Sequence, residues 1–223
     1  MKILVACPTA EYKKYCLNEY VEGLKRLTYS HDILIIDNSE NDSYLKLIEK
    51  KGLPVVKDKY LEKARARIVH SRNMIRKKVL EGCYDYFLSL EQDVIPPPDI
   101  IERLLRANKK IVTGVYYTRY MVQGKPKYLP LIWQQVESDK MRFMEESELN
   151  KGVQPIYACG LGCILIHKSV LEKIKFRYEE DKVTFDDMFF CKDARDNGFE
   201  LFADTSLKCQ HLIEGMSWKG IKK

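Results

Sequence analysis

With 223 residues, 45% of them hydrophobic, the chain is long enough to bury a substantial core, and we expect one α/β domain spanning residues 1–223. Its formal charge of +6 comes from interleaved bases and acids, with no long basic run before the tail at 219–223, so it suits an anionic ligand and does not indicate nucleic acid. Seven cysteines without a C-x-x-C pair, and no apolar stretch near the roughly 18 residues of a membrane span, argue against a zinc ribbon, a disulfide scaffold and a transmembrane protein; we expect a cytoplasmic protein with at most peripheral membrane contact.

The first part of the chain alternates strand and helix patterns. Continuous apolar runs at 2–7 (KILVAC) and 32–37 (DILIID) are typical of buried parallel strands, and 53–58 (LPVVKD) is a weaker third. Between the first two, 11–27 places aromatic, cysteine and leucine side chains four residues apart, which predicts an amphipathic helix; these are Tyr12, Cys16, Tyr20 and Leu24.

The middle of the chain continues this alternation. A helix is predicted over 64–82, with Ile68, Ile75 and Val79 on one face and Gly82 at its C-terminal end; Arg72 falls on the same apolar face. A strand at 84–90, a proline-led helix at 96–107 and a strand at 110–117 follow. This order predicts a doubly wound, mostly parallel sheet.

The last part begins with an excursion. Residues 119–152 lose clear periodicity, which indicates a functional loop or lid, or a disordered segment. Residues 157–174 then predict a glycine-rich turn, a strand and a helix, and 185–198 predict a short helix that opens with two acids and closes at Gly198.

Two acids, Glu91 and Asp93, follow the buried strand at 84–90 directly. Ligands of parallel α/β sheets bind outside the carboxyl ends of the strands, and carboxylates suit Mg²⁺ or Mn²⁺, which share oxygen ligands with phosphates. The alternative is that these acids only cap the next helix, an explanation that fits Asp99 better.

The segment 87–101 (FLSLEQDVIPPPDII) resembles the D-x-D region of the family 2 type of GT-A glycosyltransferases, with glutamate in place of the first aspartate. The resemblance covers nearly the whole chain. It implies a GT-A fold, which is a Rossmann-like α/β sandwich with a mostly parallel central sheet and helices on both faces. It also implies a nucleotide-binding half at 1–95 and an acceptor-side half at 96–223 that contains the excursion. Asp93 would bind the metal, with Gln92 beside it and Glu91 as a second ligand.

The same resemblance assigns a nucleotide pocket. Segment 3–9 (ILVACPT) is similar to the first strand of the family, with Pro8 and Thr9 near the nucleotide, and in 33–42 (ILIIDNSEND) Asp37 would read the base. Arg72 would face the nucleotide while Asn73 supports the helix. The alternative for Arg72 is a side chain that snorkels or pairs with an acid in the core.

Catalytic residues follow from two later segments. Segment 184–201 (TFDDMFFCKDARDNGFEL) resembles the E-D motif of inverting members, so Asp187 would be the catalytic base, and Asp186 replaces the usual glutamate. Asp186 is also explained as an acid favourable to the helix dipole. His211 would be a third metal ligand, against the alternative of an ordinary surface histidine.

Small and aromatic residues complete the expected site. In 157–163 (YACGLGC), Gly160 and Leu161 would border the donor sugar and acceptor, although Gly160 and Gly162 also fit a plain tight turn. Trp133 and Tyr128 are candidates to stack on a sugar ring, or else they close a small satellite core.

The resemblance therefore implies a metal-dependent, inverting hexosyltransferase. It would move a sugar from a UDP- or GDP-sugar, with Mn²⁺ or Mg²⁺ as cofactor, to a hydroxyl of a glycan, lipid or protein. A sugar-phosphate nucleotidyltransferase would need a glycine-rich loop after the first strand, and a dehydrogenase would need G-x-G-x-x-G there; 7–15 (CPTAEYKKY) contains no glycine. A catalytically inactive nucleotide-sugar-binding protein stays open as the non-enzymatic alternative.

Overall fold

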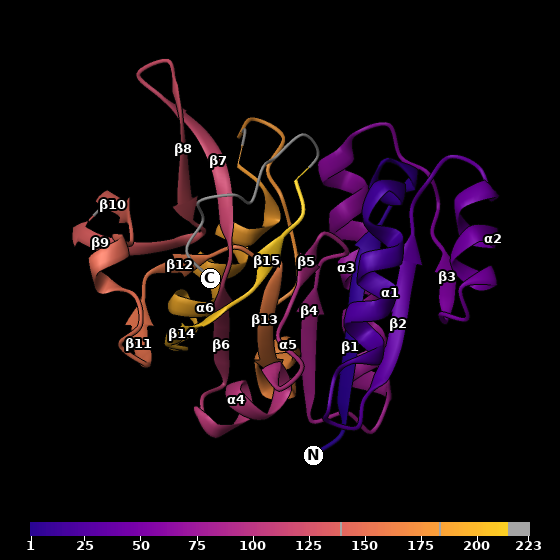
Figure 1. Cartoon of the computed structure of the whole chain (residues 1–223), viewed down its shortest axis with the longest axis horizontal. Coiled ribbons are helices and arrows are strands. Elements are labelled where there is room, and N and C mark those ends of the chain that lie inside the picture. Colours follow the sequence, from indigo (N-terminus) through magenta and orange to yellow (C-terminus); the bar gives the residue numbers. More distant parts are fainter. Residues whose placement is uncertain (139, 183, 214–223) are drawn as a thin grey trace.

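The computed structural model describes residues 1–138, 140–182 and 184–213 (Figure 1). The basic tail at 219–223 lies outside these described residues. Within them, no helix is both long and apolar enough to cross a bilayer. All seven cysteines are free, and six of them are buried.

A central sheet of eight strands organises the molecule, in the order β11-β14-β6-β13-β4-β1-β2-β3. Neighbouring strands are parallel except where β13 pairs with β4 and β6 and where β11 pairs with β14. The prediction of a mostly parallel sheet is confirmed. The strands are β1 (Ile3–Thr9), β2 (Asp32–Asp37), β3 (Val55–Lys57), β4 (Tyr86–Leu90), β6 (Ile111–Val115), β11 (Val153–Ile156), β13 (Cys163–His167) and β14 (Leu201–Lys208).

Helices cover both faces of this sheet (Figure 1). One face carries α1 (Leu17–Lys25), α2 (Ser43–Lys50) and α4 (Ile100–Arg106); the other carries α3 (Ala64–Glu81), α5 (Lys168–Lys173) and α6 (Asp186–Asp196). Strand β1 explains the unbroken apolar runs: Ile3, Val5 and Cys7 pack into one core, while Leu4 and Ala6 pack into the other. A strand between two helical layers has no solvated face, so it needs no polar alternation.

The predicted helix at 11–27 has two parts. A 3-10 helix, η1 (Glu11–Cys16), leads into α1, and Tyr12 is 63% exposed, so the predicted apolar stripe was wrong at this residue. The helix predicted over 64–82 is confirmed as α3. The helix ends at Gly82. A glycine is required there because a Cβ would lie 2.7 Å from the Tyr84 ring.

The excursion at 119–152 is mostly β structure, so the prediction of an irregular or disordered segment was wrong. Strands β7 (Tyr117–Val122) and β8 (Lys125–Pro130) form a hairpin that extends away from the central sheet (Figure 1). Strands β9 (Ile132–Glu137) and β10 (Lys140–Phe143) pair with β12 (Ala158–Cys159) in a second sheet, followed by η2 (Glu146–Glu148). Gln123 and Gly124 both have positive φ, as tight hairpin turns require.

Two features frame the predicted site. A two-stranded sheet joins β5 (Val94–Ile95), just after Asp93, to β15 (Gln210–His211) near the end of the described chain. At its outer edges the central sheet ends in β3, which has three residues, and in β11, where Pro155 lies opposite Phe202.

Candidate active site

Thr9 and Gln92 lie together in the fold, and their contact with a nucleotide stays a prediction. The Thr9 hydroxyl donates to the side-chain oxygen of Gln92 at 2.5 Å, and the Gln92 amide donates to the Tyr44 hydroxyl at 2.6 Å. Gln92 is 1% exposed, whereas Pro8 is half-buried beside Thr9. These bonds fix the loop after β4 against the end of β1. Gln92 is therefore a buried residue that positions this loop.

Asp93 is 5% exposed, and its two carboxylate oxygens differ in their surroundings. Oδ2 accepts from the Lys13 ammonium and lies 3.2 Å from His211 Nε2 and 3.5 Å from the Tyr15 hydroxyl. Oδ1 is buried and has no hydrogen-bond partner among the described residues. Burial raises the pKa of Asp93, but the His211 hydrogen bond and the Lys13 charge outweigh it and lower the pKa to about 2. The carboxylate is therefore ionised, with one oxygen free to accept a cation.

His211 is buried, so the alternative of an ordinary surface histidine is wrong. The residue is 8% exposed, and its strand pairs with Val94 next to Asp93. Its Nδ1 lies 2.6 Å from the Tyr117 carbonyl oxygen, to which it can donate, and its Nε2 lies 3.2 Å from Asp93 Oδ2. Nε2 can donate to Asp93 when it carries a hydrogen and can ligate a metal when it does not. A metal-ligating histidine has this arrangement, because a carbonyl on one nitrogen fixes the tautomer that leaves the other free to ligate.

The residues present fit a hard divalent cation in part. An unpartnered carboxylate oxygen and a neighbouring imidazole suit Mn²⁺ or Mg²⁺, which take further ligands from phosphate and water. Over the described ranges, however, no group of three or more His, Cys, Asp or Glu side chains could hold a metal ion. Glu91 is turned toward Arg72, whose Nη2 lies 2.6 Å from Oε1, so the structure does not bring Glu91 into a ligand set with Asp93.

Arg72 is a core residue, which is the alternative that the sequence left open. It is 2% exposed and donates to Ser89 at 2.9 Å and to Glu91 at 2.6 Å, and its Nε lies 2.6 Å from Asp186 Oδ2. Asp186 is 4% exposed, so its main partner is this guanidinium. The pair joins the segment that carries Asp93 to the start of α6. The charge of Arg72 is paired inside the protein, and a contact of Arg72 with a nucleotide stays a prediction.

Asn73, the next residue on α3, ties this helix to the segment after α5. Its side chain donates to the Phe176 carbonyl at 2.8 Å and accepts from the Phe176 amide at 3.1 Å. It thus supports the position of the helix, as expected.

Asp187 begins α6 beside Asp186 and is partly buried. Its Oδ1 accepts from the Met188 amide at 2.7 Å. Burial and the neighbouring Asp186 charge raise the pKa of Asp187 to about 6, well above the ordinary value for an aspartate. The group is thus a stronger base than the sequence alone suggested, and it is still mainly ionised at pH 7.

Asp37 stands at the end of β2, where it was expected, but its side chain is satisfied internally. Oδ1 accepts from the Ser39 amide at 3.0 Å and from the Ser39 hydroxyl at 2.5 Å, and Oδ2 accepts from Lys57 at 3.0 Å. The residue is fully buried. These bonds give it a structural role in the loop after β2, and contact with a base stays a prediction.

Sequence reasoning missed a further buried acid, Asp58. It comes directly after β3, next to the strand that ends in Asp37, and it is 3% exposed, with His70 Nδ1 at 2.7 Å and the Ser71 hydroxyl at 2.7 Å. The signal was available, because the segment at 53–58 ends in this aspartate. The sequence gave no comparable signal for Lys13, whose partner lies 80 residues away.

The glycines at 160 and 162 make room for Tyr116. A Cβ on Gly160 would lie 2.2 Å from the Tyr116 hydroxyl oxygen, and one on Gly162 would lie 2.7 Å from the same ring. Tyr116 is 3% exposed and accepts a hydrogen bond from the Gly162 amide at 2.8 Å. Leu161 is also buried, at 2% exposed. The structure thus assigns these small residues to packing, and a donor-sugar contact at Gly160 or Leu161 stays a prediction.

The aromatic residues of the excursion close a satellite core, as the alternative proposed. Trp133 is 8% exposed, with its ring centroid 4.9 Å from that of Phe143, and Tyr128 packs partly buried against the same core. Stacking of Trp133 on a sugar stays a prediction.

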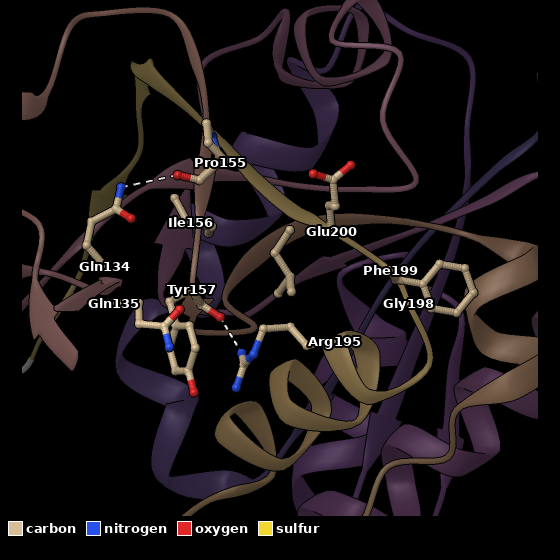
Figure 2. Close-up of a pocket in the computed structure, with 10 residues that line it drawn as sticks. Gln134, Gln135, Pro155, Ile156, Tyr157, Arg195, Gly198, Phe199 and Glu200 are labelled. Atoms are coloured by element: carbon tan, nitrogen blue, oxygen red, sulfur yellow. Dashed lines mark hydrogen bonds between the residues drawn. The ribbon is translucent and has the colours of Figure 1, made fainter. Parts of the chain in front are cut away.

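A cavity of about 460 Å³ lies at the C-terminal end of α6 (Figure 2). The guanidinium carbon of Arg195 lies 3.6 Å from the Tyr157 ring centroid on its wall, and Gln134 donates to the Pro155 carbonyl. None of the predicted site residues lines this cavity. The predicted site is instead the network around Asp93, Arg72 and Asp187.

No protein-family model and no curated protein matches the sequence, but solved structures do. S. aureus TarS 1–349 in complex with UDP-GlcNAc is similar at 14% identity with a TM-score of 0.63, covering 100% of this chain and 62% of that chain. The complex of TarS 1–349 with UDP gives 14% identity and 0.62, with 96% and 61% covered. Protein A197 from STIV gives 17% identity and 0.53, with 96% and 87% covered.

The chain has a GT-A-type glycosyltransferase fold. It spans less than two thirds of the TarS 1–349 chain, so residues of TarS outside the matched part have no counterpart in this sequence. The GT-A-type fold accounts for the mostly parallel sheet.

Proposed function

We propose that the chain is a nucleotide-sugar glycosyltransferase that moves a sugar from a UDP-sugar to a hydroxyl acceptor. The observation that carries the proposal is the buried bridge through Arg72, which joins Glu91, two residues before Asp93, to Asp186, directly before Asp187. It holds the proposed metal-binding loop and the proposed base at one edge of a GT-A-type fold. The UDP and UDP-GlcNAc complexes of TarS support the choice of donor.

The donor would bind at the loop after β4. Asp93 and His211 would hold a divalent cation, Mn²⁺ or Mg²⁺, which would neutralise charge on the departing diphosphate. The unpartnered Asp93 Oδ1 and the orientation of His211 Nε2 support this role. Two protein ligands leave room for diphosphate oxygens and water.

Asp187 would accept the proton of the acceptor hydroxyl as that oxygen attacks the sugar from the face opposite the diphosphate. This in-line attack inverts the anomeric carbon. A base with a pKa near 6 is deprotonated at pH 7 and accepts a proton more readily than an ordinary aspartate, and such general-base catalysis contributes roughly 10²- to 10⁴-fold. Orientation of donor and acceptor would supply much of the remaining rate enhancement.

Thermal denaturation with nucleotides tests the donor and metal assignments. UDP with Mn²⁺ should raise the melting temperature by about 5–10 °C at 100 times its Kd, because ligand binding adds about 2.7 kcal/mol at that ratio. GDP-, ADP- and CDP-sugars serve as comparisons. Asp93→Asn should lose most of this shift, and Asp99→Asn, at the N-cap position of α4 and outside the network, should keep it. Equal shifts for both variants in Mn²⁺ and in EDTA would remove the metal assignment.

Product analysis separates transfer from mere binding. Incubation with UDP-GlcNAc and candidate acceptors should release UDP and give a product of inverted anomeric configuration by NMR. Binding of the donor without transfer or donor hydrolysis would support the alternative of an inactive nucleotide-sugar-binding protein.

A further inference from the structure

Lys13 contacts the carboxylate group that the proposed metal site uses, at Oδ2, beside the unpartnered Oδ1. Its ammonium is ion-paired with Asp93 Oδ2, and the two side chains are 20% and 6% exposed. The backbone of Lys13 is fixed, because its carbonyl accepts from the Gln92 side chain at 2.7 Å and its amide donates to the Ala10 carbonyl at 2.8 Å. The position of the lysine is therefore built into the loop that carries Asp93.

This ammonium and the His211 ring contact the same oxygen of Asp93. Asp93 Oδ2 accepts from Lys13, and His211 Nε2 lies 3.2 Å from the same oxygen. A divalent cation held by both side chains would stand against a positive charge, and the burial of the carboxylate leaves little water to screen the repulsion. The lysine and the cation are thus alternative partners of Asp93.

A donor diphosphate bound at Asp93 would offer the lysine another partner. Its flexible stem and three N–H donors let the ammonium turn about a fixed backbone, and a diphosphate bound at Asp93 offers anionic oxygens next to it. Tyr12, whose ring centroid lies 5.7 Å from the ammonium nitrogen, provides an aromatic surface along this path. The diphosphate oxygens can contact both the Lys13 ammonium and the divalent cation. The two positive charges would then no longer compete for Asp93.

We propose that Lys13 competes with the divalent cation for Asp93 and that the donor diphosphate relieves this competition by accepting the Lys13 ammonium. The inference rests on the proposed function and adds a binding role for a residue of η1. The expected consequence is that the cation binds weakly alone and tightly with the nucleotide. By linkage, the cation raises the affinity for the nucleotide by the same factor as the nucleotide raises the affinity for the cation.

Direct titration of Mn²⁺, with free Mn²⁺ followed by electron paramagnetic resonance, tests the competition with and without UDP. For the wild-type protein, UDP should tighten Mn²⁺ binding more than ten-fold. Lys13→Met should bind Mn²⁺ alone about ten-fold more tightly than wild type, and UDP should improve that affinity less than three-fold. UDP affinity at saturating Mn²⁺ should fall in this variant, because the diphosphate loses a cationic partner.

Two control variants separate charge from fold. Lys14→Met removes an exposed lysine of the same 3-10 helix and should behave as wild type, and Lys13→Arg keeps the positive charge and should keep Mn²⁺ binding weak without UDP. If Lys13→Met and Lys13→Gln both bind Mn²⁺ as wild type does while UDP still binds, the inference is wrong and the proposed function stands. If no variant binds UDP in any condition, both are wrong.

Discussion

Asp187 is the proposed general base, and the same carboxylate is expected to lower the stability of the folded protein at neutral pH. Asp187→Asn keeps the size of the side chain and removes its basicity, so transfer should fall by roughly 10² or more while UDP binding survives. In the wild-type protein, kcat should decline as the pH falls through about 6, where burial and Asp186 place the pKa of this group. Steady-state rates and UDP titration measure the two effects. Donor binding that fell as far as the rate would contradict the role as base.

The same carboxyl group should destabilise the folded protein at neutral pH. Its folded pKa of about 6 exceeds an unfolded value near 3.9, so the folded state binds the proton more tightly and stability falls as the pH rises between these values. The penalty is absent below about pH 4 and complete above about pH 6. Asp187→Asn should therefore raise the free energy of unfolding at pH 7 by roughly 1–3 kcal/mol and change it little at pH 4. Urea denaturation at the two pH values measures this, and an equal effect at both would contradict it.

Arg72 and Asp186 should couple strongly in stability. Arg72→Met leaves a fully buried carboxylate without its guanidinium and should cost about 3–5 kcal/mol. Asp186→Asn should cost less, because Arg72 keeps its contact with Glu91. The double variant should cost less than the sum of the single changes, since neither charge is left unpaired at that pair. Additive costs in urea denaturation would show that the two side chains do not interact.

At this residue scale, the sequence located acids and missed their partners. Asp93 and Asp187 could be predicted because each stands where a strand ends or a helix begins, which local patterns show. The pairs Lys13–Asp93 and Arg72–Asp186 form between residues that lie 80 and 114 positions apart in the sequence. One sequence without structure carries no signal for such pairs.

Among the elements, the turn between β12 and β13 is shaped by the side chain of Tyr116. Gly160→Ala would place a Cβ 2.2 Å from the Tyr116 hydroxyl oxygen and should cost about 1–3 kcal/mol through overpacking. Tyr116→Phe removes the clashing oxygen, so the double variant should recover part of this loss, although the Gly162 amide then lacks its acceptor. Chemical denaturation of the three variants checks this. No recovery would mean that backbone strain, and not the hydroxyl contact, sets the cost.

Helices and strands were predicted correctly where the apolar residues followed one clear period. They were missed where prolines and charged residues interrupted that period. Helix α3 and strands β1, β2 and β4 appear where apolar spacing placed them. The β7–β8 hairpin went unrecognised because prolines at 126 and 130 and scattered charges obscure the alternation, although Gln123-Gly124 was a usable turn signal. Its pairing depends on packing against the neighbouring sheet, as in the contact between Tyr120 and Phe143.

For the whole molecule, the two halves predicted from the sequence should fold as one unit. Strands of residues 1–95 and 96–223 meet where β4 pairs with β13 along five residue pairs, and both apolar cores draw on both halves. A fragment of 1–95 should therefore lack a cooperative transition, because β4 would become an exposed apolar edge. The full chain should unfold in a single transition by circular dichroism and by fluorescence. A fragment with a native-like cooperative transition would contradict this.

The outer strands of the central sheet also bear on how copies of the molecule meet. An open sheet edge offers its free N–H and C=O groups to any other strand, and long, regular edges promote association between sheets. Here one edge is β3, only three residues long, and the other is β11, where Pro155 has no N–H to donate. Both ends of the sheet are therefore poor templates for a further strand. The architecture therefore discourages growth by strand addition at either edge of the eight-stranded sheet.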